Sequence, residues 1–366
     1  MCRRHLCPNM KILYALQATG NGHISRANEI IPILQTMARV DVLLSGTQSD
    51  VKLNHPIRYR KKGISFVSGK NGGIDYLASL KLLRRKQFLQ ELQQIQVEEY
   101  DFVINDFEPL SAWACRIKKV PCIALSHQYA VLSLHAPTSK NLHPIAWLLL
   151  KYFAPCSAGL GLHFKSYNPA TSTPIIRSEI RNAYKRNLGH YTVYLPAYSD
   201  KKILKVLGKI KQVQWQVFSK EARKSYAHNN CWVRPISNAE FISSISTCEG
   251  ILCGSGFETP AEALYLQKKL MVIPMKGQYE QQCNAKALKQ LGVPVLKKLS
   301  IKQYPKIAQW SCDFHQVGID YPDNARQVVA VIFEIYKLFH KNNPLETIRE
   351  FSQPAHGAVA HSSIQV

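Results

Sequence analysis

The stretch from residue 250 to residue 292 holds polar residues at spacings that suit a phosphorylated ligand. Gly254, Ser255 and Gly256 follow an apolar segment and precede a predicted helix, so a phosphate can approach the backbone closely. Thr259 can donate a hydrogen bond at the helix N-terminus, where the helix dipole favours negative charge. Glu262 lies one helical turn further on, where a carboxylate can accept both hydroxyls of a ribose. Together these residues predict a nucleotide site.

A second polar group follows the next predicted strand, which runs from Leu270 to Ile273 and ends before a proline. The helix expected after it begins in a carboxamide-rich segment. We expect its polar side chains to face a sugar, and they are Glu280, Gln281, Gln282 and Asn284.

Two charged positions near this site have competing interpretations. Glu258 stands four residues before Glu262 on the same helical face, and we favour stabilisation of the helix dipole over a direct role. The sequence has no Asp-x-Asp metal motif, so we expect no metal, and backbone groups, Arg and Lys must neutralise a diphosphate. Arg177, in the segment TPIIR, is the first candidate for this task, and Arg181 is the second.

The N-terminal half carries a further candidate site in the glycine turn 19-TGNGH-23, between a predicted strand and a predicted helix. Gly20, Asn21 and Gly22 allow a ligand close to the backbone, and His23 can act as a general base near neutral pH. A solvated helix cap is the alternative for His23. Asp106, just beyond another strand of the same sheet, can hold one tautomer of His23 and stabilise its cation. Asp106 can equally cap the following helix.

The same turn nearly fits a dinucleotide fingerprint, as Gly20-x-Gly22-x-x-Ser25. An NAD site needs an acidic residue near the end of the next strand to bind the ribose. Here that strand ends in Leu44, Ser45 and Gly46, so the sequence disfavours a dehydrogenase.

Such sites need a scaffold that brings strand ends together, and predicted strands and helices alternate in two blocks. The predicted strands are Lys11–Gln17, Val40–Ser45, Asp101–Asn105 and Pro121–His127, then Thr192–Leu195, Val213–Phe218, Ile251–Cys253 and Leu270–Ile273. The predicted helices run to about Met37, over Lys81–Gln96, from about Pro109, over Asp200–Ile210 and over Glu280–Leu291. This alternation predicts parallel sheets covered by helices on both faces.

We therefore predict an α/β fold with two tandem doubly wound, Rossmann-like domains and a cleft between them. The first domain is expected over residues 10–170 and the second over residues 171–340. The irregular stretch from Lys165 to Tyr191, rich in Pro, Ser, Thr and Asn, marks the junction. Residues 353–366 are predicted to be a disordered tail.

Composition restricts the class of protein and its surroundings. A hydrophobic content of 46% with 19% charged residues is typical of a folded soluble protein. No apolar run approaches the ~18 residues that span a bilayer, and the N-terminus lacks the apolar region of a secretory signal. The ten cysteines lack metal-ligand spacing. We expect free thiols in a reducing cytoplasm.

The net charge of +23 is compatible with three kinds of partner, namely nucleic acid, an anionic membrane surface and phosphorylated substrates. Basic clusters lie at residues 58–62, 81–86, 181–186 and 201–211. No RRM signature, zinc-finger spacing or long basic heptad accompanies them, so we expect no nucleic-acid partner.

With these residues in hand, the chain resembles the GT-B glycosyltransferases, most closely the branch around the enzyme that adds N-acetylglucosamine to the peptidoglycan lipid carrier. It is also similar to a broader set of bacterial and archaeal transferases that share KILYALQATGNGHISRA and NDFEP. The similarity covers the chain from Met10 to about Leu338.

The resemblance implies roles for individual residues. It makes His23 the base for the acceptor, places Arg177 on the donor diphosphate, and matches Gly256, Thr259 and Glu262 to the family pattern G-x-x-T-x-x-E. It also implies further donor contacts. These are the amides Gln281 and Gln282 with Asn284 nearby on the sugar, the main chain of Ile236 on the base, and Ser199 of LPAYSD on phosphate.

The resemblance further implies a nucleotide-sugar donor, a UDP-hexose or UDP-N-acetylhexosamine, with no cofactor or metal. Retaining relatives carry two glutamates eight residues apart, whereas Glu258 and Glu262 are four apart, which favours inversion. A lipid-linked acceptor and a cytoplasmic enzyme peripheral to the inner face of the membrane are expected. The segments KLLRRK and AWLLLKYF are the candidate membrane contacts.

Two alternatives stay open from the sequence. A nucleotide-sugar 2-epimerase shares the GT-B fold and needs no acceptor, so it alone would convert UDP-N-acetylglucosamine without one. A non-enzymatic nucleic-acid-binding protein would instead be retained on DNA with a steep salt dependence.

Overall fold

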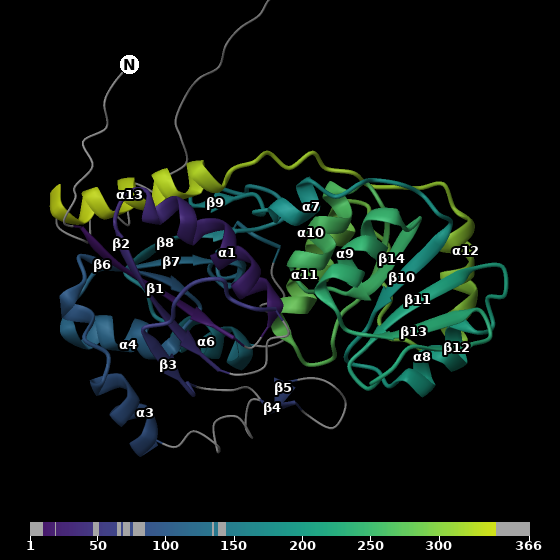
Figure 1. Ribbon diagram of the computed structural model, residues 1–366, viewed down its shortest axis with the longest axis horizontal. Helices are drawn as coiled ribbons and strands as arrows, with labels where there is room; N and C mark the ends of the chain where they lie inside the picture. Colours follow the sequence, from purple (N-terminus) through teal and green to yellow (C-terminus); the bar gives the residue numbers. More distant parts are fainter. Residues whose placement is uncertain are drawn as a thin grey trace, which may run out of the picture.

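The computed structural model describes residues 10–18, 20–46, 51–63, 67–68, 74–75, 85–133, 135–137 and 144–341. These residues form two α/β domains side by side, each built on one largely parallel β-sheet (Figure 1). The predicted class, two tandem doubly wound domains, is confirmed.

The first sheet has seven strands in the order β3-β2-β1-β6-β7-β8-β9. They are β1 (Lys11–Gln17), β2 (Arg39–Ser45), β3 (Tyr59–Lys61), β6 (Phe102–Asp106), β7 (Cys122–Ser126), β8 (Ala158–Leu162) and β9 (Thr171–Ser172), all paired in parallel. Strand order reverses between β1 and β6, where Leu16 lies opposite Asp106. The carboxyl ends of such strands are where ligands bind in doubly wound sheets. Two short strands, β4 (Val67–Ser68) and β5 (Ile74–Asp75), pair separately.

Helices cover both faces of this sheet. Alternate side chains of β1 point to opposite sides and are apolar on each side, so both faces must be buried. Ile12, Tyr14 and Leu16 pack in one core cluster with α1, while Leu13 and Ala15 pack in another with α4. The helices of this part are α1 (Asn21–Gln35), α3 (Arg85–Gln93), η1 (Val97–Glu99), α4 (Pro109–Lys118), α5 (His127–Val131) and α6 (Pro144–Phe153).

The second sheet has six strands in the order β12-β13-β11-β10-β14-β15. They are β10 (His190–Tyr194), β11 (Gln214–Ser219), β12 (Tyr226–His228), β13 (Cys231–Pro235), β14 (Gly250–Gly254) and β15 (Lys269–Ile273), with only β12 antiparallel. Its helices are α7 (Ser178–Arg181), α8 (Asp200–Leu207), α9 (Asn238–Thr247), α10 (Glu258–Tyr265), α11 (Tyr279–Gln290), η2 (Ile301–Gln303) and α12 (Tyr304–Cys312). Its switch point lies between β10 and β14.

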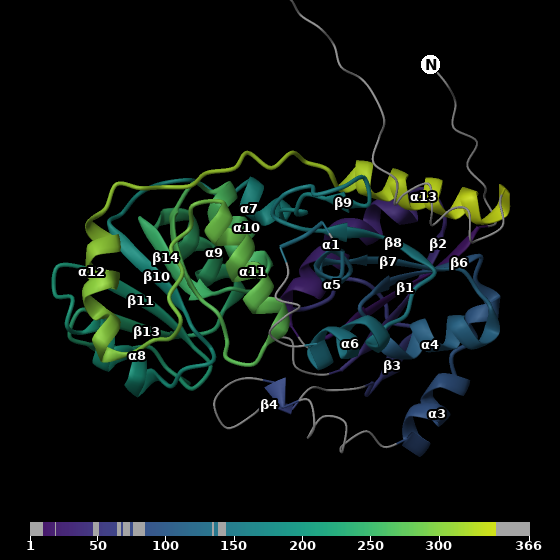
Figure 2. The same cartoon turned by 180° about the vertical axis from the view of Figure 1, so that it is seen from behind.

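The last helix departs from the predicted division of the chain. From α12 at the far end of the second domain, the chain returns along the molecule to α13 (Ala325–Lys341), as both views show (Figures 1 and 2). There α13 packs against α1 and β8 of the first domain. Residues 325–341 therefore complete the first domain, although the sequence assigns residues up to 340 to the second.

Most predicted elements appear within a few residues of their expected bounds, and β1 matches its prediction in full. The helix predicted over Lys81–Gln96 is described as α3 from Arg85, and residues 81–84 of the KLLRRK segment lie outside the described residues. The predicted tail at 353–366, Cys2 and Cys7 also lie outside them. The cysteines that the structure describes are free thiols, as predicted. Among the described helices, none is long and apolar enough to cross a membrane.

Candidate functional site

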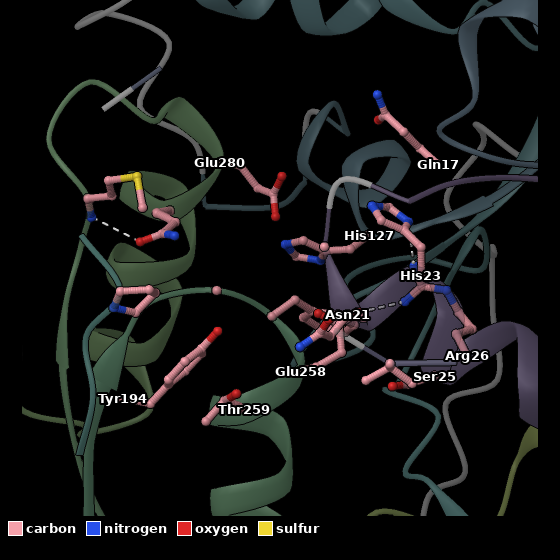
Figure 3. A pocket seen from close by; sticks show the side chains of 18 of the residues that line it. Gln17, Asn21, His23, Ser25, Arg26, His127, Tyr194, Glu258, Thr259 and Glu280 are labelled. Carbon is pink, nitrogen blue, oxygen red and sulfur yellow. Dashed lines mark hydrogen bonds and ion pairs between the residues drawn. The ribbon is translucent and has the colours of Figure 1, made fainter. Parts of the chain in front are cut away.

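The cleft between the two domains holds a cavity of about 610 Å³. Its walls come from the segment after β1 on one side and from the starts of α10 and α11 on the other (Figure 3). The predicted site residues that line it are Gly20, Asn21, Gly22, His23, Arg177, Ile236, Gly256, Thr259, Glu262, Glu280 and Gln281. The predicted residues outside its lining are Asp106, Ser199, Gly254, Ser255, Gln282 and Asn284.

His23 and Asp106 form a hydrogen-bonded pair at the first-domain wall. His23 lies in the first turn of α1, directly after the glycine turn, and its Nδ1 is 2.8 Å from Asp106 Oδ1. Asp106 is the last residue of β6 and is fully buried behind the histidine. The two residues are 83 positions apart in sequence but meet at the switch point of the sheet. The structure thus brings the predicted base and its carboxylate together.

The turn after β6 fixes the direction of Asp106. Phe107 adopts a left-handed backbone with φ of 57°, which is costly for a residue with a large side chain. Asn105 Oδ1 accepts the Glu108 backbone N–H at 3.0 Å on the other side of this residue. Glu108 in turn caps α4 by accepting the backbone N–H groups of Leu110 and Ser111. The helix cap predicted for Asp106 is therefore supplied by Glu108.

Charges around His23 define its tautomer. Burial alone raises the pKa of Asp106, but Arg26 and His23 outweigh it and hold that pKa below its usual value. An ionised carboxylate only accepts hydrogen bonds, so Nδ1 of His23 must carry the shared proton. In the neutral imidazole, Nε2 then keeps its lone pair. Burial lowers the pKa of His23, but Asp106 raises it more, and the net pKa lies above the ordinary value.

Helix α10 is held by two arginines that meet its two glutamates. Arg26 Nη1 donates to Glu258 Oε1 at 2.9 Å, across the cleft from the first domain. Arg177 donates to Glu262 through Nε at 2.6 Å and Nη2 at 3.0 Å. Glu258 therefore makes a direct ion pair between the domains, beyond the dipole role favoured from the sequence. Gly22 lies against Glu258 so closely that a Cβ on the glycine would collide with the carboxylate.

Arg177 and Glu262, predicted to bind diphosphate and ribose, are bound to each other. Arg177 also donates to Asn238 Oδ1 at 2.8 Å, and both members of the pair reach the cavity wall. Burial alone lowers the pKa of Arg177, but Glu262 raises it to a net value above the usual one, so the cation persists. A nucleotide at this wall would meet an ion pair that is already oriented.

The residues predicted for the sugar separate into two groups. Glu280 and Gln281 line the cavity, although Gln281 Oε1 accepts the Met275 backbone N–H at 2.9 Å. Asn284 is fully buried, and its Oδ1 is 2.7 Å from His127 Nε2, while its Nδ2 donates to the Ser255 carbonyl. Asn284 thus joins the two domains beneath the cavity and does not face it, which corrects the predicted position.

Of the residues predicted to contact phosphate, some line the cavity and others do not. Gly256 and Thr259 line the cavity at the start of α10, whereas Ser255 is buried and donates its hydroxyl to the Gln281 carbonyl. Gly254 ends β14 outside the lining. Ser199 is the residue before α8 and is also outside the lining, whereas Ile236 is part of it.

The sequence reasoning missed several lining residues. Arg26 follows His23 by three positions, so helical spacing could have placed both on one face of α1. His127 is the last residue of a predicted strand, and it stacks on Phe257 with ring centroids 4.0 Å apart. Gln128 donates to Glu280 Oε2 at 3.1 Å across the cleft. Other lining residues that were missed include Gln17, Phe107, Tyr194, Lys220, Asn238 and Gln278.

Comparisons with known proteins agree with this geometry. The family model described as "Glycosyl transferase family 1" matches residues 10–307, while no curated protein matches the chain by sequence. A solved structure of the glycotransferase of kitacinnamycin is 12% identical, with 93% of this chain and 98% of that chain covered at a TM-score of 0.57.

Two further solved structures share the fold. The S. aureus MnaA–UDP co-structure is 12% identical, with 92% of this chain and 99% of that chain covered at a TM-score of 0.59. MurG of Acinetobacter baumannii is 16% identical, with 89% and 99% covered at a TM-score of 0.51. The chain therefore belongs to glycosyl transferase family 1 and has the GT-B fold.

Proposed function

We propose that the protein transfers a sugar from a UDP-hexose or UDP-N-acetylhexosamine to a hydroxyl acceptor, with inversion and without a metal ion. The observation that carries the proposal is the position of the His23–Asp106 pair. His23, backed by the buried Asp106, faces Thr259 and Glu262 of helix α10 across one cavity of about 610 Å³.

The second-domain wall suits a nucleoside diphosphate. Gly256 and Thr259 lie at the N-terminus of α10, where backbone N–H groups and the helix dipole attract phosphate. Glu262 lies one turn inward, within reach of a ribose, and Arg177 brings positive charge to the same wall. The S. aureus MnaA–UDP co-structure, which has the same fold, supports a uridine nucleotide.

The donor sugar would then lie between this wall and His23. Glu280 and Gln281 at the start of α11 supply a carboxylate and an amide beside it. Ile236 at the cavity wall is the candidate for main-chain recognition of the base. Ser199, Gly254, Ser255, Gln282 and Asn284 keep only a supporting role in this proposal, because none of them lines the cavity.

The chemical step follows from the tautomer of His23. Its Nε2 takes the proton of the acceptor hydroxyl while that oxygen attacks the anomeric carbon. The bond from this carbon to the diphosphate oxygen breaks on the opposite face, which inverts the configuration. The nucleoside diphosphate leaves with the electron pair, and the start of α10 and Arg177 stabilise the charge that develops.

Apolar side chains beside the first-domain wall favour an acceptor that carries a lipid. Leu149 and Leu150 of α6 line the cavity, while Leu148 and Tyr152 on the same helix are about half exposed. Together with the net charge of +23, this arrangement favours docking on an anionic membrane. Equally poor binding to vesicles with and without anionic lipid would remove this part of the proposal.

A thermal-shift screen across UDP-, GDP- and dTDP-sugars tests donor binding, since a ligand that binds the native state raises its melting temperature. We expect UDP-sugars to give the largest shift. Donors that bind are then incubated with prenyl-linked saccharides, and release of nucleoside diphosphate is measured with and without EDTA. Acceptor-dependent, EDTA-resistant release and an inverted product by NMR are expected. Conversion of UDP-N-acetylglucosamine without any acceptor would identify an epimerase instead.

A further inference from the structure

Arg26 contacts both the carboxylate behind the base and the opposite domain, and no sequence pattern assigned it a role. It is 4% exposed, in α1, one turn after His23. Its Nε donates to Asp106 Oδ2 and its Nη2 to Asp106 Oδ1, each at 2.9 Å. The third nitrogen, Nη1, donates to Glu258 Oε1 at 2.9 Å. Figure 3 shows the guanidinium beside His23 and directed at Glu258.

The two bonds to Asp106 control the carboxylate that orients His23. A guanidinium is planar and matches both oxygens of a carboxylate, which fixes the plane of the carboxylate as well as its charge. Asp106 Oδ1 is shared between Arg26 Nη2 and His23 Nδ1. Rotation of Asp106 away from His23 would therefore break a bond to Arg26 as well. Lysine, a point charge, can hold the charge but not the plane.

The third bond connects this arrangement to the other domain. Glu258 is the first residue of α10, and its side chain is 35% exposed at the rim of the cavity. It reaches Arg26 over Gly22, where a Cβ would displace the Glu258 carboxylate. If α10 moves away from α1, Arg26 loses this partner and keeps only Asp106. The guanidinium is thus held in place from both sides of the cleft only when the domains are in contact.

We propose that Arg26 is a positioning residue that makes the orientation of the His23–Asp106 pair depend on contact with α10 through Glu258. The inference rests on the proposed function, because it takes His23 as the base. The inference goes beyond that function, because the first domain alone does not fix the orientation of His23. The contact with α10, made when the cleft closes over the donor, is also needed. Groups that face His23 are Asp106 from β6, Arg26 from α1 and Glu258 from α10, with the buried Tyr14 phenol near Asp106.

Steady-state kinetics of four variants test whether the base depends on Arg26 and on its contact with Glu258. The variants are Arg26→Gln, Arg26→Lys, Glu258→Gln and the double variant Arg26→Gln/Glu258→Gln. We expect Arg26→Gln to lower kcat about 100-fold with little change in the KM for donor, because a positioned base contributes about 10²–10⁴-fold. Arg26→Lys should recover part of the loss. Glu258→Gln should lower kcat less, and the double variant should be no slower than Arg26→Gln. Arg39→Gln and Glu334→Gln remove exposed charges away from the cavity and serve as controls.

A second readout is independent of turnover. In protein labelled with ¹⁵N-histidine, the imidazole shifts report the tautomer, and the signals missing in His23→Asn assign His23. We expect an Nδ1–H imidazole in the wild type and a mixture with Nε2–H in Arg26→Gln. The mixture should also appear in Glu258→Gln, whose partly exposed site makes misfolding a poor explanation.

Three results separate the possibilities. An unchanged His23 tautomer in both single variants, or losses of kcat that multiply in the double variant, would overturn the role of Arg26. Absence of sugar transfer by the wild type with every donor and acceptor would instead reject the proposed function. The imidazole shifts would still decide whether Arg26 and Glu258 position His23.

Discussion

The carboxylate of Glu258 lies directly over Gly22, across the cleft between the domains, so that even one methyl group on the glycine would collide with it. This contact brings the start of α10 against the turn that presents His23. A side chain at the second glycine of TGNGH would displace the Glu258 carboxylate from this position. The same contact delivers Glu258 to Arg26, at 2.9 Å.

Gly22→Ala should therefore lower activity without lowering the stability of the fold. The colliding atoms belong to the end of a flexible side chain, so Glu258 can move, and Ala suits a helical position better than Gly. We expect an unchanged or slightly higher melting temperature but a loss of about 10-fold in kcat/KM, on the scale of a lost charge-assisted hydrogen bond. Gln35→Ala, at the exposed end of the same helix and outside the cavity lining, is the control. Equal activity of both variants would contradict a functional contact.

The pH dependence should follow the environment of His23. The base must be neutral, and Asp106 outweighs burial to give a net pKa above the ordinary value of about 6.5. Activity should thus fall as the pH drops through a midpoint above 6.5. In Asp106→Asn the raising charge is gone, so the midpoint should move to lower pH. The maximal rate should fall about 10²–10⁴-fold, since an amide can donate to Nδ1 and reverse the tautomer. An acidic midpoint that does not move would contradict the pairing.

Arg177→Lys should discriminate phosphate recognition from recognition of the nucleoside. The substitution keeps the charge but loses the two-point contact with Glu262. We expect the thermal shift produced by UDP to shrink while the small shift produced by uridine stays the same. Arg181→Lys is the control, because Arg181 donates to the main-chain carbonyls of Ile176, Tyr321 and Pro322. Equal losses for UDP and uridine would place Arg177 away from the diphosphate.

Asn284→Ala should affect stability rather than sugar selection. It removes the partner of His127 Nε2 and of the Ser255 carbonyl, both in buried surroundings. We expect the free energy of unfolding in urea to drop by about 1–3 kcal/mol, the penalty for unsatisfied buried polar groups. Gln282→Ala, outside the cavity lining, should change it by less than about 0.5 kcal/mol. A changed preference among donor sugars with unchanged stability would restore Asn284 to the sugar site.

Local sequence patterns predicted the parts of the fold that local forces determine. The buried strand β1 was predictable from its apolar run, and the glycine turn with His23 from its composition. The strand β12 gave no such signal, because Tyr226–His228 is an exposed edge strand without alternation. The docking of α13 on the first domain depends on a return of the chain that no local pattern encodes.

In the candidate site too, local sequence patterns predicted single residues but not the contacts between the two domains. His23 and Asp106 could be paired in advance because strand ends of one sheet converge. Arg26 and Glu258 are 232 positions apart and belong to different domains, so only their relative placement reveals the ion pair. Arg177 and Glu262 were each predicted to bind the donor, but their bond to each other was not, since both were assigned to a ligand.

The measurement that tests the central claim most directly is acceptor-dependent release of nucleoside diphosphate by the wild type and by His23→Ala. Both proteins are assayed with saturating donor, and donor binding is followed by thermal shift. We predict that His23→Ala binds the donor as the wild type does and loses about 10²–10⁴-fold in kcat, as expected for a missing general base. Near-wild-type turnover by His23→Ala would contradict the assignment of His23 as the base.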